Sequence, residues 1–169
     1  IVFGDWSSDV CSSDLDILLD NIRSAYNVGS ILRSADACGI SHVHCAGITP
    51  TPDQLKVQKT ALGAQDMLPW TQHWNTQDCV QQAKQNGYQI ISFEFTTAST
   101  SLFELAPSML RFPVLLVFGN EVAGVDPEII HSSDYTLHIP MYGKKSSINV
   151  ATASGIAMYF IRYYSQITQ

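Results

Sequence analysis

The strongest strand signal in this chain is Pro113-Val-Leu-Leu-Val-Phe118, which runs directly into Gly119-Asn120-Glu121. A short apolar run followed at once by glycine and polar residues is typical of a buried strand that ends at a binding crevice. Two more segments, residues 21–33 and 139–150, also place polar residues and glycines just past an apolar run. Because the carboxyl ends of parallel strands share one edge of a sheet, we expect the three segments to meet there.

Apolar runs alternate with helical patterns along the rest of the chain. Strands are expected at residues 16–20, 42–46, 67–70, 88–95, 113–118 and 135–139, and helices at 27–38, 52–62, 76–86, from 126 and from 149. Asn27 is expected to cap the first helix, and Gly39 to end it. The alternation predicts an α/β domain with a mainly parallel sheet.

The length and composition favour one domain with a real core. The chain has 169 residues, of which 46% are apolar, and its apolar runs are too short to cross a membrane. Residues 1–15 contain a near repeat of Ser-Ser-Asp and lack the pattern of a signal peptide. We therefore expect a non-native or disordered prefix over residues 1–15 and a single domain over residues 16–169.

Charge and cysteine usage narrow the class of partner. A net charge of −6 argues against a general nucleic-acid binder. Four of the nine basic residues nevertheless lie in the quoted segments, namely Arg23, Arg33, Lys144 and Lys145. The five histidines are scattered and lack the spacing of metal ligands, so no metal site is predicted. Cys11, Cys38, Cys45 and Cys79 are expected to be free thiols in a reducing cytoplasm.

Three segments, taken together and in this order, resemble the three motifs of the SpoU/TrmH family. They are Asn21-Ile-Arg-Ser-Ala-Tyr-Asn-Val-Gly-Ser-Ile-Leu-Arg33, Phe118-Gly-Asn-Glu-Val-Ala-Gly124 and Ile139-Pro-Met-Tyr-Gly-Lys-Lys-Ser-Ser-Ile-Asn149. This is the SPOUT class of S-adenosylmethionine-dependent RNA 2′-O-ribose methyltransferases. The resemblance runs from about residue 17 to the end of the chain. It implies a SPOUT fold with a C-terminal trefoil knot, S-adenosyl-L-methionine as cofactor, and tRNA or rRNA as substrate. Two alternatives stay open: a non-catalytic RNA-binding relative, and a small-molecule methyltransferase.

Matched to the family motifs, five residues are predicted to carry the reaction: Arg33, Asn27, Glu121, Ser147 and Asn149. A guanidinium does not readily lose its proton, so Arg33 is expected to fix the ribose and to stabilise the developing alkoxide. Glu121 is expected to position the first motif rather than to act as a base. Asn149 is expected to orient Arg33 or the ribose, with support from Ser147. Without the family, Ser147 and Asn149 are more typical of a helix cap and Arg33 of an exposed arginine, and Asn27 also fits a helix cap.

The resemblance also assigns residues that bind the cofactor and the RNA. Backbone and apolar walls for the cofactor are predicted at strand ends, from Glu94, Gly119, Ile139, Met141 and Ile148. Glu94 has a simpler interpretation as a polar residue at the end of a strand. Contacts to RNA phosphates are predicted for Arg23, Lys144 and Lys145.

The last helix bears on the oligomeric state. Residues 150–161 carry no charge, and a helix that is apolar all round must be covered all round. Its small residues, among them Ala153 and Ala157, permit another element to approach closely. Burial within one subunit is the simpler explanation, but the family is typically dimeric through this helix. We therefore predict a homodimer, in which the resemblance implies that one subunit presents arginines to the other's cofactor.

Overall fold

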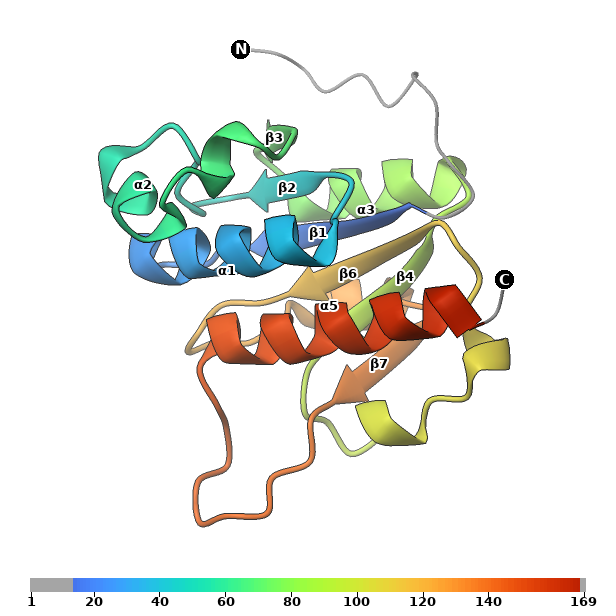
Figure 1. Ribbon diagram of the computed structural model, residues 1–169. Coiled ribbons are helices and arrows are strands. Elements are labelled where there is room, and N and C mark those ends of the chain that lie inside the picture. The colour runs from blue at the N-terminus through green and yellow to red at the C-terminus, as the bar shows by residue number, and fades with distance from the viewer. Residues whose placement is uncertain (1–13, 168–169) are drawn as a thin grey trace.

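The central layer of the computed structural model, which describes residues 14–167, is a seven-stranded sheet (Figure 1). The strand order is β3-β2-β1-β6-β4-β7-β5, and every neighbouring pair is parallel. The strands are β1 Leu15–Asp20, β2 Val43–Ala46, β3 Trp70–His73, β4 Gln89–Phe93, β5 Thr100–Ser101, β6 Val114–Phe118 and β7 Tyr135–His138.

Helices cover both faces of this sheet. They are α1 Ala25–Cys38, α2 Leu55–Ala61, α3 Thr76–Gln85, α4 Pro127–Ser132 and α5 Val150–Ile167. Helices α1 and α5 lie on one face and α3 on the opposite face (Figure 1). The predicted parallel α/β class is therefore confirmed, whereas the trefoil knot stays a prediction from the resemblance.

The first strand shows how the two faces are filled. Every residue of β1 is buried, as expected for a parallel strand that is covered on both sides. Ile17 packs in the core beneath α1 and α5, and Leu18 packs with residues of α3 on the other face. Because side chains alternate along a strand, Asp16 and Asp20 share the α3 face with Leu18. Two carboxylates are thus placed in a layer that should be apolar.

Several predicted boundaries need correction. Leu15, which the sequence places in the prefix, is the first residue of β1 and is completely buried. The rest of the predicted prefix, apart from Asp14, lies outside the described residues. The strand predicted at 67–70 is wrong, because β3 begins only at Trp70, after a short 3₁₀ turn. The sequence of β3, Trp-Thr-Gln-His, lacks the apolar pattern of a buried strand, because Thr71 and His73 face other polar groups rather than an apolar layer.

Helix α1 begins earlier than its sequence suggests. Ser24, not Asn27, is the N-cap, because the Asn27 backbone N–H donates to the Ser24 hydroxyl at 3.3 Å. The prediction that Asn27 caps this helix is therefore wrong, and its side chain is free to bond elsewhere. Gly39 ends the helix in the left-handed conformation, with φ 69°, as predicted.

The glycine of the first motif holds α1 against α2. A Cβ atom at Gly29 would overlap the Thr60 hydroxyl and the Val57 carbonyl oxygen. The Thr60 hydroxyl also donates to the Tyr26 carbonyl oxygen across this contact. Gly29 therefore serves packing, and it helps to fix the position from which Asn27 and Arg33 project.

Across residues 14–167, none of the helices combines the length and the apolar character that a bilayer span requires.

Candidate active site

Two adjoining cavities open where β4, β6 and β7 end. The larger has a volume of about 630 Å³ and the smaller about 150 Å³. They share part of their lining, which comprises Phe93, Glu94, Ser147, Ile148 and Ala153. Ligands of parallel α/β folds bind outside the carboxyl ends of strands, so this location is the expected one.

Glu121 is the centre of a hydrogen-bond network at the rim of the larger cavity. One carboxylate oxygen accepts the Arg23 backbone N–H at 2.8 Å. The other accepts the Ser24 backbone N–H at 3.0 Å and the Asn27 side-chain amide at 2.9 Å. The second motif therefore fixes both the backbone that enters α1 and the first polar side chain on that helix.

Asn27 connects this network to the third motif. Its side-chain oxygen accepts a hydrogen bond of 3.0 Å from the Asn149 amide. The Asn149 oxygen in turn accepts the Ala151 backbone N–H at 2.8 Å, so Asn149 also caps α5. Glu121, Asn27 and Asn149 thus form one chain of side chains that joins the three segments.

The environment of Glu121 favours its charged form. Partial burial by itself raises the pKa of the Glu121 carboxyl, but the hydrogen bonds from the Arg23 N–H and the Asn27 amide outweigh this effect. The net pKa therefore lies below the ordinary value of 4.5. A carboxylate that is held in this way is a weak proton acceptor, which suits a positioning role better than the role of a base.

Glu121→Gln is expected to destabilise the protein at neutral pH and to lose this effect in acid. In the unfolded chain Glu121 titrates near its ordinary pKa, so its contribution is complete above that value and disappears as the pH falls through the lower pKa of the folded state. Urea unfolding of both proteins between about pH 7 and about pH 3 measures the difference. Glu104→Gln, at an exposed glutamate outside the cavities, is the control. A destabilisation that is the same at every pH would contradict the assigned role.

The loop after β6 is closed by its own hydrogen bonds. The backbones of Asn120 and Gly124 exchange two hydrogen bonds of 2.9 and 3.0 Å. The Asn120 amide donates to the Asn21 carbonyl oxygen at 2.7 Å, which ties this loop to the first motif. Glu94 accepts the Val125 backbone N–H at 3.0 Å and closes the loop from the β4 side. The wall formed by residues 119–125 is therefore pre-formed.

Most residues predicted for the reaction do meet in space. The larger cavity is lined by Asn27, Glu121, Ser147 and Asn149. Arg33 does not line it, but borders a separate hollow with Asp36, Leu62 and Met67. Six helical residues turn a side chain by about 240° and advance it by about 9 Å, so Asn27 and Arg33 leave the helix in different directions.

All five residues predicted to bind the cofactor line the two cavities. Gly119 belongs to the larger, Ile139 and Met141 to the smaller, and Glu94 and Ile148 to both. Their roles stay predictions, but the fold brings them to one place.

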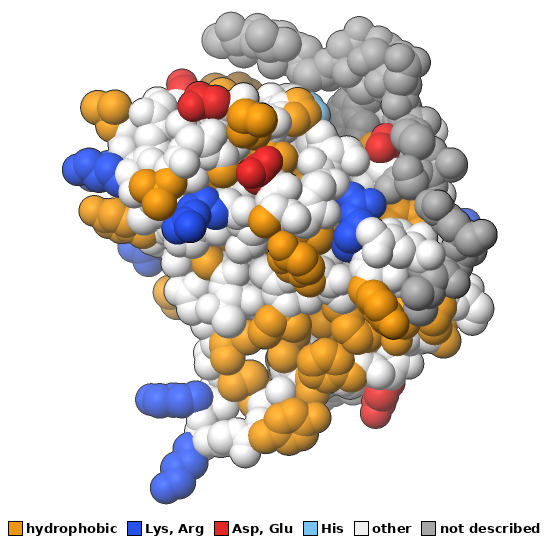
Figure 2. All heavy atoms as spheres, viewed as in Figure 1, with side chains coloured by type: hydrophobic (Ala, Val, Ile, Leu, Met, Phe, Trp, Pro, Cys, Tyr) orange, Lys and Arg blue, Asp and Glu red, His pale blue; other side chains and the backbone are white. Residues whose placement is uncertain are grey.

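The residues predicted to contact RNA lie outside these cavities. Arg23, Lys144 and Lys145 are exposed. Basic side chains project from the loop between β7 and α5 (Figure 2). Positive charge is therefore placed where a polyanion could approach rather than inside the pocket.

Several residues of the site were not predicted from the sequence. The Asn120 side chain bonds within its own loop and to the backbone of the first segment, so it organises two of the three segments. The rings of Phe93 and Phe118 stack beneath the cavity with 5.1 Å between their centroids. Asn120 could have been recognised, because it is a polar residue directly behind a buried strand. The aromatic pair could not, because both residues are typical of any strand core.

Known proteins share this fold and are similar to this chain in sequence. Residues 14–159 match the SpoU rRNA Methylase family. Over 152 residues the chain is 31% identical to the tRNA (guanosine(18)-2′-O)-methyltransferase of Aquifex aeolicus, covering 86% of this chain and 67% of that protein. It is 29% identical to the 23S rRNA (guanosine(2553)-2′-O)-methyltransferase RlmP of Bacillus subtilis, covering 86% of this chain and 57% of that protein.

The similarity to solved structures also extends over most of this chain. An AdoMet-bound rRNA methyltransferase from Sinorhizobium meliloti superposes with a TM-score of 0.85 at 28% identity. The match covers 92% of this chain and 58% of that one. The chain therefore spans between about half and two thirds of the length of these relatives.

Proposed function

The chain belongs to the SpoU rRNA methylase family, and on this basis we propose that it is an S-adenosylmethionine-dependent methyltransferase that modifies a ribose 2′-hydroxyl of tRNA or rRNA. The observation that carries this proposal is the hydrogen-bonded chain of Glu121, Asn27 and Asn149 at the mouth of the cavities. It unites the three motifs at one place. The names of the relatives, which include a tRNA and an rRNA methyltransferase, support an RNA substrate.

The cavities suit S-adenosylmethionine. Glu94 and Glu121 line them, and neither lining contains Lys or Arg. The negative charge of the lining therefore favours a positively charged sulfonium. Apolar walls from Phe93, Met141 and Ile148 suit an adenine ring. When bound, S-adenosylmethionine supplies a methyl group that is already activated for transfer.

The residues of the chain would then orient the acceptor hydroxyl. Asn27 and Asn149 hold each other's amides in one orientation, so they present fixed polar atoms at the cavity mouth. Preorganised dipoles of this kind stabilise charge that develops during a reaction without reorganising. Glu121 fixes Asn27 and the backbone of Arg23. Arg33 does not line the cavity of its own chain, so the Arg33 of a second copy would supply the positive charge for the alkoxide. Lys144 and Lys145 would hold RNA phosphates next to the pocket.

The direct test uses S-adenosylmethionine labelled in its methyl group, with separated tRNA and rRNA pools. Label is expected in one RNA pool, in a nucleotide whose 3′ phosphodiester resists alkaline cleavage because its 2′-oxygen is methylated. Label in a product that ribonuclease does not degrade would favour a small-molecule methyltransferase. Binding of RNA without transfer would favour a non-catalytic relative.

We further propose that the protein acts in the cytoplasm as a homodimer joined through α5. The buried free thiols of Cys38, Cys45 and Cys79 suit a reducing compartment. One face of α5 is exposed although it is apolar, with Ile156, Tyr159 and Tyr163 at 37%, 52% and 60% exposure. Figure 2 shows hydrophobic side chains gathered over this helix. Such a patch is typical of a protein interface.

The structure changes which substitution tests the dimer. Ala157, which the sequence suggested for close approach of a partner, is buried in the core of its own subunit, and Gly155 faces Ser34 of α1. Tyr159→Glu is instead expected to give folded monomers, because it places charge in the exposed face. Light scattering at micromolar concentration measures the mass, and Trp74→Glu, at an exposed position outside α5, is the control. A monomeric wild-type protein would refute the proposal.

A further inference from the structure

A buried polar cluster lies on the α3 face of the sheet, away from the cavities. His44 comes from β2, His73 from the end of β3 and Cys79 from α3, and Asp16 of β1 lies beside them. In the register of the sheet, His44 pairs with Thr71 and Ala46 with His73, so the two histidines are diagonal neighbours on one face. The surrounding layer consists of apolar residues such as Leu18 and Val80. Such a cluster is costly to bury unless its members bind one another or a ligand.

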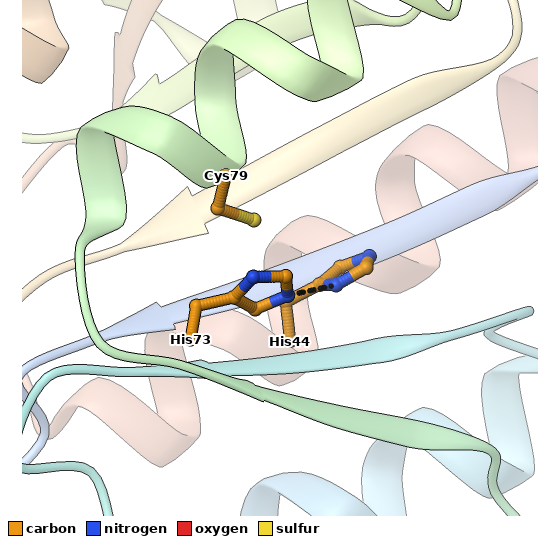
Figure 3. Close-up of side chains that lie close together, drawn as sticks. All are labelled: His44, His73 and Cys79. Atoms are coloured by element: carbon orange, nitrogen blue, oxygen red, sulfur yellow. Dashed lines mark hydrogen bonds between the residues drawn. The ribbon is translucent and has the colours of Figure 1, made fainter. Parts of the chain in front are cut away.

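The side chains converge on one point (Figure 3). The His44 Nδ1 and His73 Nε2 atoms lie 3.0 Å apart, and Cys79 projects from α3 toward both rings. One potential ligand atom from each of His44, His73 and Cys79 lies within 4.8 Å of the other two. His44 and Cys79 are completely or almost completely buried, whereas His73 is half-buried. The cluster therefore has a closed inner side and an outer side that reaches the surface beside His73.

We propose that His44, His73 and Cys79 bind a divalent metal ion of the zinc class. Two imidazoles and one thiolate are ligands that zinc prefers, and they are poor ligands for magnesium or calcium. The fourth position, on the side of His73, would be filled by water. None of the three residues lines the cofactor cavities, so this site is independent of the proposed methyl transfer.

The distances are those of a site that needs little rearrangement. Zinc–nitrogen bonds of about 2.0–2.1 Å and zinc–sulfur bonds of about 2.3 Å place ligand atoms roughly 3.3–3.6 Å apart in a tetrahedron. The pair of ring nitrogens would have to open by a few tenths of an ångström from 3.0 Å, and the sulfur would have to move inward. These are movements of side chains rather than of strands.

The Asp16 carboxylate lies next to His44, the first of the proposed ligands. The other ring nitrogen of His44, Nε2, lies 3.6 Å from the Asp16 carboxylate. A metal-bound histidine commonly directs its second nitrogen to a carboxylate, which fixes its tautomer and orientation. On the other side the His42 ring stacks on His44 at 4.6 Å between centroids, and His42 itself bonds to the Thr71 hydroxyl. His44 is therefore held from two sides with Nδ1 directed to the proposed site.

The sequence predicts no metal site because the histidines are scattered along the chain without ligand spacing. The fold nevertheless brings three of the five histidines together, namely His42, His44 and His73. Each ligand comes from a different element, so the bound ion would join β2, β3 and α3. We expect it to stabilise this edge of the sheet.

The test is a titration with Co²⁺ as a spectroscopic substitute for Zn²⁺. Tag-free protein is stripped with a chelator, kept reduced and then titrated. A bound ion is expected to show an intense thiolate-to-cobalt band in the near ultraviolet and the visible bands of a tetrahedral ion, and added Zn²⁺ should remove both. Zn²⁺ should also raise the melting temperature of the stripped protein.

Matched variants locate the site. Cys79→Ser should remove the thiolate band, whereas Cys45→Ser should keep it, since Cys45 is equally buried but packs on the opposite face. Cys11→Ser should also keep it, which excludes the thiol that lies outside the described residues. Asp16→Asn should weaken binding roughly 10–100-fold, as expected for the loss of a supporting carboxylate.

Two results would overturn the proposal. One is folded wild-type protein that shows neither the thiolate band nor a Zn²⁺-dependent melting temperature, which would leave a neutral hydrogen-bonded histidine pair. The other is a signal that Cys79→Ser and His73→Gln do not change, which would place the ion elsewhere. If Cys79→Ser does not fold, His73→Gln decides, because its half-buried position tolerates an amide.

Discussion

Arg33→Ala is expected to lower kcat for RNA methylation by about 10²–10³-fold, the effect of removing one electrostatic donor from a reacting oxygen. Binding of S-adenosylmethionine should be unchanged, because Arg33 does not line the cavities. Single-turnover assays with calorimetry of the cofactor measure the two effects separately. Arg111→Ala, at an arginine whose side chain is 75% exposed, is the control. Near-native turnover of Arg33→Ala would show that the role assigned to this residue is wrong.

The position of Arg33 adds a sharper expectation. Because it points away from the cavity of its own chain, we expect it to act on the site of a second copy. Mixing Arg33→Ala with a variant that cannot bind cofactor should then restore activity, since each mixed dimer has one site with both an intact cavity and an intact arginine. Random assortment of the subunits gives roughly a quarter of the wild-type sites. Activity that does not recover on mixing would place Arg33 and its cavity in the same subunit.

Gly119→Ala is the variant expected to lose the cofactor. A Cβ atom at this position would overlap the Gly124 carbonyl group and the Val125 nitrogen, which are backbone atoms and cannot swing aside. The loop must shift, and the hydrogen bonds between Asn120 and Gly124 that form the cavity wall would break. Overpacking costs about 1–3 kcal/mol, which corresponds to a roughly 5–150-fold weaker Kd if the whole cost falls on the binding-competent loop.

The matched control adds the same methyl group where there is room. At Gly155 a Cβ atom would lie 3.6 Å from the Ser34 hydroxyl oxygen, an ordinary contact. Calorimetry should therefore show native cofactor affinity for Gly155→Ala and weakened affinity for Gly119→Ala. Equal affinities for the two variants would mean that the wall at Gly119 does not border the cofactor.

The class of fold follows from local patterns in the chain. Residues 113–118 are an apolar run of strand length, and β6 occupies Val114–Phe118, almost as predicted. Such runs are informative because a strand covered on both faces must be apolar at every position. The same rule explains the failure at β3, whose Thr71 bonds to His42, just before β2, and whose His73 bonds to His44 of β2. A polar strand inside a sheet has no local signal.

By itself the sequence determined the class of the fold, the three motifs and the types of residue that a methyltransferase site needs. Only the tertiary structure decided which of these residues meet. The hydrogen bonds from Asn27 to Glu121 and from Asn149 to Asn27 join residues 94 and 122 positions apart, and Arg33, on the same helix, turns away from them. The same holds for His44, His73 and Cys79. Periodicity records which face of its own element a side chain occupies, whereas the partner across that face depends on how the elements pack, which no local pattern contains.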